Sequence, residues 1–226
     1  SEKSVFGVPN ASMISTMWKW FNSKLPIDGS VRINDLSNET SIIALQGPES
    51  ISILRDVLGE ENIVSRFSCQ KIVKNNLDIT GWIQGTGYTG ERGVEIFIPN
   101  DQASILWDSL IDSGAIPVGL GARDTLRLEK GYLLSGQDFL WPGLDIQPDI
   151  QIPDRFLFRN SVETNVPFGL NLDHDFIGKE SVIKSLKSGA RWLGIVCQER
   201  GPNPRPGHMV FDGPSDSAKK VGYVTS

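Results

Sequence analysis

Apolar side chains recur about every three to four positions in several stretches of the chain, the spacing that places them on one face of a helix. The helices predicted in this way cover residues 11–25, 48–58, 100–114 and 119–134. Alternating apolar and polar residues predict a strand at 41–45 and a β-meander over 70–98 that turns at Asn75-Asn76. Elements in this order favour an α+β fold with antiparallel sheets over regular βαβ winding.

The regular pattern stops after Gln137. Prolines and glycines predict a long irregular excursion over residues 139–165, and loops of that length usually carry function or cover another surface. Regular patterning returns at 168–172 and 180–186, and strand patterns return at 192–198 and 220–224.

Composition limits the partners. The chain has 226 residues, of which 39% are hydrophobic, so it can bury a core. Its formal net charge of -5 argues against nucleic acid and anionic membranes as partners. The sequence contains no run of about 18 apolar residues, the pattern that would predict a membrane span.

Cysteine and histidine are scarce. Cys69 and Cys197 lie far apart, which argues against a disulfide scaffold and favours a reducing, cytoplasmic setting. His174 and His208 are the two histidines, so we expect neither a histidine-based metal site nor a Ser-His-Asp triad, and we expect no metal cofactor.

A glycine-rich stretch over residues 85–93 connects two predicted strands. A phosphate-binding loop would lead into a helix and be followed by lysine, and this stretch does neither. The simplest interpretation is a hairpin whose glycines supply positive φ. Tyr88, Glu91 and Glu95 lie in or beside it, so pattern alone leaves open either a ligand site or an exposed acid on a half-buried strand.

The predicted helix over 119–134 carries two arginines. Arg123 and Arg127 are one turn apart, so they could bind a carboxylate or phosphate together, or lie on a solvated face beside Asp124. Tyr132 follows Arg123 by nine residues, about two and a half helical turns, which places it on the opposite side. The two can share a pocket only if the helix bends or ends near Gly131.

Five segments together resemble one family. Residues 85–96 read G-T-G-Y-T-G-E-R-G-V-E-I and are similar to the T-G-Y-T-G-E-x-G-x-E signature of aminomethyltransferases, the T-proteins of the glycine cleavage system. The other four, in family order, are A-L-Q-G-P at 44–48, G-L-G-A-R-D-T-L-R-L-E-K-G at 119–131, D-F-I-G-K-E at 175–180 and G-Y-V-T-S at 222–226.

This resemblance implies a multi-subdomain, tetrahydrofolate-binding α+β fold. Residues 1–186 would form its central folate-binding part, with two interleaved subdomains, and residues 187–226 would begin a C-terminal β-barrel subdomain. The activity implied is transfer of the aminomethyl carbon from the lipoyl arm of H-protein to tetrahydrofolate, with release of ammonia. Lipoylated H-protein and tetrahydrofolate would be the partners.

The resemblance also implies roles for four residues. Glu95 would bind the pterin and Tyr88 would line the same site. Arg123 would bind on the folate side and Tyr132 would help to line the pocket. The chemistry agrees, because a pterin offers paired N–H donors and a flat face, and its glutamyl tail needs cationic partners.

Some features depart from the family. Its catalytic aspartate lies upstream of the block that residues 8–11 resemble, so we expect it outside this chain and assign no catalytic residue. We also expect the chain to be truncated at both ends, and Gly85 stands where the family usually has arginine. Two alternatives stay open: a folate-dependent demethylase or the folate domain of an oxidase, and a non-catalytic folate-binding module.

Overall fold

The computed structural model describes residues 4–140, 152–153, 158–165, 170–187 and 191–226. The chain divides into two compact units, Trp18–Tyr132 on one hand and Ser1–Met17 with Leu133–Ser226 on the other. The subdomain boundary predicted between residues 186 and 187 stays a prediction. All four predicted folate-binding residues belong to the Trp18–Tyr132 unit.

A four-stranded antiparallel sheet forms the centre of the Trp18–Tyr132 unit. Its strands follow the order β1-β4-β3-β2. They are β1 (Thr40–Gln46), β2 (Cys69–Lys71), β3 (Trp82–Gln84) and β4 (Gly93–Pro99). With the helices that follow, this sheet confirms the predicted α+β fold.

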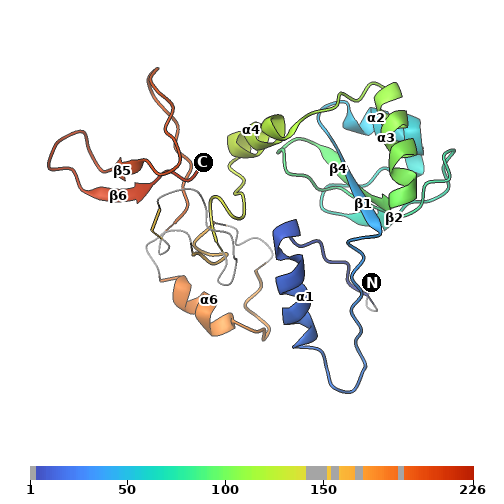
Figure 1. The fold of residues 1–226 in the computed structure, drawn as a ribbon, viewed down its shortest axis with the longest axis horizontal. Coiled ribbons are helices and arrows are strands. Elements are labelled where there is room, and N and C mark those ends of the chain that lie inside the picture. The colour runs from blue at the N-terminus through green and yellow to red at the C-terminus, as the bar shows by residue number, and fades with distance from the viewer. Residues whose placement is uncertain (1–3, 141–151, 154–157, 166–169, 188–190) are drawn as a thin grey trace. The chain divides into compact units, whose positions relative to one another are not determined.

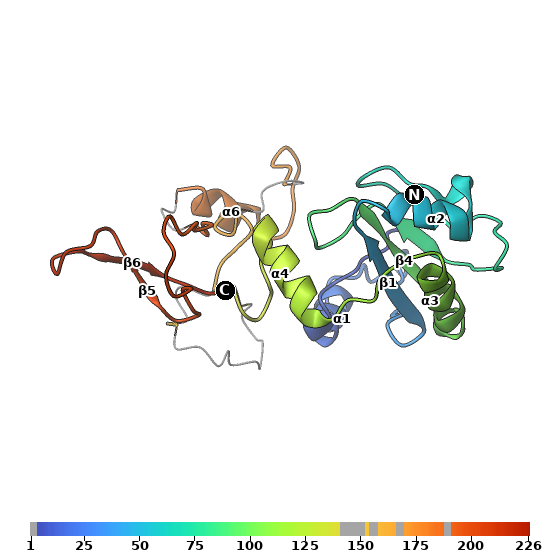
Figure 2. The ribbon, with the colours of Figure 1, turned by 90° about the horizontal axis from the view of Figure 1, so that it is seen from above.

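One face of the sheet is covered by two helices, α2 (Ser50–Leu58) and α3 (Ala103–Asp112), which lie side by side (Figures 1 and 2). Alternation along the strands turns one set of apolar side chains to this face, and helical spacing supplies the facing set. The buried core includes Ile43, Leu45, Leu54, Leu58, Ile83, Val94, Ile96, Ile98, Leu106 and Leu110. The predicted helix over 48–58 and the predicted strand at 41–45 are therefore confirmed.

The opposite face of the sheet carries the polar residue of interest. Glu95 on β4 pairs with Ala44 on β1 and with Gln84 on β3, so the three share one face. Ile42, on the same face, is 51% exposed. A carboxylate is therefore held on rigid backbone, on the side away from the hydrophobic core.

The predicted turn at Asn75-Asn76 is wrong. Strands β2 and β3 are short, and a wide loop joins them, because the Asn75 side chain bonds to the loop's own backbone. Its Oδ1 accepts from the backbone N–H groups of Leu77 and Ile79, and its Nδ2 donates to the carbonyls of Val73 and Ile79. These bonds replace the ladder that a two-residue turn would need.

Helix α4 (Leu120–Lys130) is shorter than the predicted helix over 119–134. Gly131 follows it in the left-handed conformation at φ 82°, and the Tyr132 N–H donates to the Arg127 carbonyl at 2.8 Å. A left-handed glycine at this position ends many helices, because it lacks the Cβ that makes the conformation costly.

The other unit contains η1 (Ala11–Met13), α6 (Lys179–Ser185) and a two-stranded antiparallel sheet of β5 (Met209–Phe211) and β6 (Lys220–Tyr223). The unit boundary falls within α1 (Ile14–Asn22). The regular pattern at 180–186 corresponds to α6, and the strand pattern at 220–224 is confirmed by β6.

The strand predicted at 192–198 is wrong. Residues 191–197 have no regular structure, and Leu193 and Val196 are each 79% exposed. The backbone N–H of Trp192 donates to the Glu163 carbonyl at 2.9 Å, but the described residues show no ladder of such bonds to a neighbouring strand here, and a strand needs one. Most of the predicted excursion over 139–165 lies outside the described residues.

Candidate functional site

The glycine-rich stretch runs from β3 into β4, strand to strand, as predicted. Two of its glycines allow close contacts. A Cβ on Gly87 would lie 2.0 Å from Oε1 of Gln46, and a Cβ on Gly90 would lie 2.5 Å from the Lys130 side chain. Gly90 also has φ 79°, which L side chains rarely adopt. The loop can therefore lie against both the end of β1 and the end of α4.

Gln46, the last residue of β1, fixes this loop. Its Nε2 donates to the carbonyl of Thr86 at 3.1 Å and to the carbonyl of Val94 at 2.9 Å. Its Oε1 accepts from Oγ1 of Thr89 at 3.3 Å. One amide side chain thus ties two points of the loop to β4.

Glu95 is half-buried, and its Oε2 accepts a hydrogen bond of 2.5 Å from Oγ1 of Thr86. Thr86 belongs to the same loop that Gln46 holds. Hydrogen bonds to an ionised carboxylate are short and strong, so this contact orients the Glu95 side chain.

Three predicted residues form one group around Tyr88. The guanidinium carbon of Arg123 lies 4.8 Å from the centre of the Tyr88 ring. The Tyr132 ring stacks on the same ring, with centroids 5.8 Å apart and planes inclined by 16°. Because α4 ends before Gly131, the condition stated from the sequence is met, and Tyr132 approaches the same ring as Arg123. Both tyrosines are half-buried and Arg123 is exposed.

Arg127 neither joins Arg123 in a shared site nor lies on a solvated face, so neither alternative left open by the sequence holds for this residue. Only 1% of Arg127 is exposed. Its Nη2 lies 2.7 Å from Oδ1 of Asp124, and its Nη1 donates to the Tyr132 carbonyl at 3.1 Å. Arg127 therefore fixes the end of α4, and its guanidinium is already used inside the protein.

Gln46 and Thr86, which hold the loop and the Glu95 carboxylate, do not stand out in the local sequence pattern. Both lie in segments that resemble the family, the A-L-Q-G-P block and the glycine-rich block. Gln46 contacts residues 40 and 48 positions away in the chain, and Thr86 contacts Glu95 across the loop, and no local pattern reports either contact.

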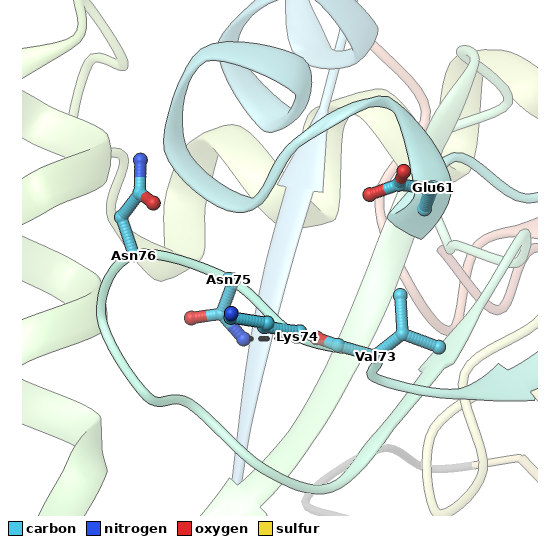
Figure 3. A pocket seen from close by; sticks show the side chains of 5 residues that line it. All are labelled: Glu61, Val73, Lys74, Asn75 and Asn76. Atoms are coloured by element: carbon cyan, nitrogen blue, oxygen red, sulfur yellow. Dashed lines mark hydrogen bonds between the residues drawn. The ribbon is translucent and has the colours of Figure 1, made fainter.

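An open hollow of about 540 Å³ lies elsewhere in the same unit, beside the loop between β2 and β3 (Figure 3). It is lined by Glu61, Val73, Lys74, Asn75 and Asn76. The Asn75 side chain is already bonded to its own loop. None of the four predicted site residues lines this hollow.

The described residues show neither a metal-binding cluster nor a membrane-spanning helix. They contain no group of three or more His, Cys, Asp and Glu side chains that could hold a metal ion. Among the helices described, none has the length and apolar character needed to cross a bilayer.

Comparison with known proteins gives consistent results. A family model described as the GCVT N-terminal domain matches residues 1–140. Aminomethyltransferase from Prosthecochloris aestuarii (strain DSM 271 / SK 413) is 34% identical over 229 residues, which cover 98% of this chain and 57% of that protein. Probable aminomethyltransferase from Halobacterium salinarum (strain ATCC 29341 / DSM 671 / R1) is 30% identical over 221 residues, covering 97% and 55%.

A solved structure is also similar. The crystal structure of glycine cleavage system aminomethyltransferase T from Bartonella henselae matches with a TM-score of 0.55 and 26% sequence identity. The match covers 83% of this chain and 47% of that chain. The chain thus spans a little over half the length of the curated relatives described above.

Proposed function

The chain belongs to the GCVT family, and from that premise we propose that the protein is a tetrahydrofolate-dependent aminomethyltransferase of the glycine cleavage system. It would transfer the methylene carbon of an aminomethyl-lipoyl group on H-protein to tetrahydrofolate. Ammonia and 5,10-methylenetetrahydrofolate would be the products. The names of its relatives support this assignment.

The observation that carries the proposal is the pairing of an oriented acid with an aromatic and cationic group on one loop. Thr86 of the loop bonds to Glu95, and Tyr88 of the loop contacts both Arg123 and Tyr132. A reduced pterin has adjacent N–H donors that suit a carboxylate and a flat ring that suits tyrosine. Each charge-assisted hydrogen bond of this kind contributes roughly 1.5–3 kcal/mol.

Arg123 would bind the acidic end of the folate. Its guanidinium is exposed and lies over a half-buried ring, so it can reach a glutamyl carboxylate while its position is held by the cation–π contact. Arg127, in contrast, is committed to Asp124 and the Tyr132 carbonyl. Of the two arginines, Arg123 is therefore the one we assign to folate.

We propose the methylene transfer as the activity of the protein as a whole, and we assign the catalytic role to none of the residues of this chain. The lipoyl group of H-protein would supply the methylene carbon. Glu95, Tyr88, Arg123 and Tyr132 would bind and orient its acceptor. We place the reaction in the cytoplasm, which the two free, exposed cysteines Cys69 and Cys197 support.

The test is a reconstituted reaction. The protein is mixed with aminomethylated H-protein and tetrahydrofolate, and both methylenetetrahydrofolate and ammonia are measured. We expect the two products in equal amounts, and neither without H-protein. Tight folate binding with no product from this donor would contradict the assignment. Product from dimethylglycine or sarcosine oxidation would then support the demethylase alternative.

A further inference from the structure

Thr86 contacts the carboxylate that we assign to the pterin. Its Oγ1 donates to Oε2 of Glu95 at 2.5 Å, and its own backbone carbonyl accepts from Nε2 of Gln46. The hydroxyl is therefore attached to a backbone position that β1 holds in place. No resemblance to the family suggested a role for this residue.

The hydrogen bond determines the plane of the carboxylate. The last torsion of a glutamate side chain is broad, so a free carboxylate samples many orientations. Two parallel N–H donors on a flat ring need both oxygens in the plane of that ring. A bond to Oε2 from a fixed hydroxyl restricts the torsion, and a carboxylate has about four acceptor sites, so both oxygens can still accept from a ligand.

The surroundings of Thr86 explain how its hydroxyl is held. Gly87 directly follows it, and a Cβ there would lie 2.0 Å from the Gln46 Oε1. Gln46 can therefore approach the loop only beside a glycine. The same amide also bonds to the carbonyl of Val94, the residue before Glu95. Gln46 thus fixes the position of Thr86, whose hydroxyl is the donor, relative to β4, which carries the acceptor Glu95.

We propose that Thr86 is a positioning residue that orients the Glu95 carboxylate for the paired N–H donors of a reduced pterin. The inference rests on the proposed function, since it requires Glu95 to contact the folate. Preorganisation of this kind improves affinity because the side chain loses less conformational freedom when the ligand binds.

The experiment measures binding of 5-formyltetrahydrofolate, a stable reduced folate, by calorimetry with the full chain. Thr86→Val removes the hydroxyl at nearly constant volume and is expected to weaken binding about tenfold, the loss of a moderately strong contact. Thr86→Ser keeps the hydroxyl and is expected to restore the affinity to within about twofold. In a Glu95→Gln background, Thr86→Val is expected to change the affinity by less than about twofold, because the two residues act as one unit.

Thr80→Val is the matched control. The Thr80 hydroxyl bonds to the Gln102 side chain at an exposed position of the same unit, so this variant is expected to bind as the wild type does. Melting temperatures of all variants separate loss of fold from loss of binding. Rescue by Thr86→Ser shows that the hydroxyl is needed, and the double variant shows that it acts through Glu95. Both results are required to exclude a structural defect of the valine variant that does not involve Glu95.

The outcomes separate the two proposals. A wild-type protein that does not bind the folate overturns the proposed function. Binding that Glu95→Gln weakens and Thr86→Val leaves unchanged overturns the positioning role alone. The positioning role is also overturned if Thr86→Val weakens folate binding equally in the wild-type and Glu95→Gln backgrounds, because the hydroxyl would then act independently of the carboxylate.

Discussion

Tyr132 stacks on Tyr88, with ring centroids 5.8 Å apart, although the two residues belong to a helix end and a hairpin loop. The contact depends on the direction of the chain after α4. Gly131 has φ 82°, and Tyr132 bonds back to the Arg127 carbonyl, so its ring is turned toward the loop. Helix termination therefore brings two of the predicted folate residues together.

Gly131→Ala is expected to lower the free energy of unfolding by about 1–2 kcal/mol, because an L side chain is disfavoured in the left-handed conformation. A Cβ there would meet no atom within 4 Å, so the cost is conformational and not steric. Chemical denaturation measures it. Gly121→Ala, inside α4, is the control and is expected to stabilise by about 0.5–1 kcal/mol. Equal effects of the two substitutions would contradict the role given to Gly131.

Arg127→Met is expected to lower the free energy of unfolding by about 1–3 kcal/mol, because it removes buried hydrogen bonds to Asp124 and the Tyr132 carbonyl. Arg123→Met is the matched control at an exposed site, expected to change stability by less than about 0.5 kcal/mol. The control should instead weaken folate binding. Urea denaturation and calorimetry together test this separation, and a stable, folate-deficient Arg127→Met protein would reverse the assignment.

Glu95→Gln is expected to weaken folate binding by about 1–3 kcal/mol, since a charged hydrogen-bond partner is replaced by a neutral one that also presents a donor. Calorimetry gives the dissociation constant. Glu91→Gln makes the same change at an exposed position of the adjacent loop and is expected to have little effect. An unchanged constant for Glu95→Gln would refute the pterin assignment.

Gly87→Ala is expected to lower the free energy of unfolding by about 1–3 kcal/mol, the usual cost of overpacking, because the new Cβ would displace the Gln46 amide. Once Gln46→Ala has removed that amide, the same substitution should cost less. Denaturation of both single variants and of the double variant gives the coupling energy. Purely additive effects would show that Gly87 and Gln46 do not interact.

Local pattern was sufficient for the elements that bury a continuous apolar stripe. The helix at 48–58 and the strand at 41–45 were predicted because their side chains alternate or repeat toward one core. The turn at Asn75-Asn76 was not, because the Asn75 side chain competes with the strand ladder for the same backbone groups. The strand at 192–198 failed for a related reason, since apolar alternation does not supply a neighbouring strand.

By itself, the sequence determined the family, through five ordered segments, and the residue types that a folate site needs. The tertiary structure decided which of those residues can act together. Spacing placed Arg123 and Arg127 on one face of a helix, but packing buried Arg127 against Asp124 and left Arg123 over the ring of Tyr88. The physical reason is that helical period fixes only the relative direction of side chains, whereas burial and hydrogen-bond partners depend on segments distant in the chain.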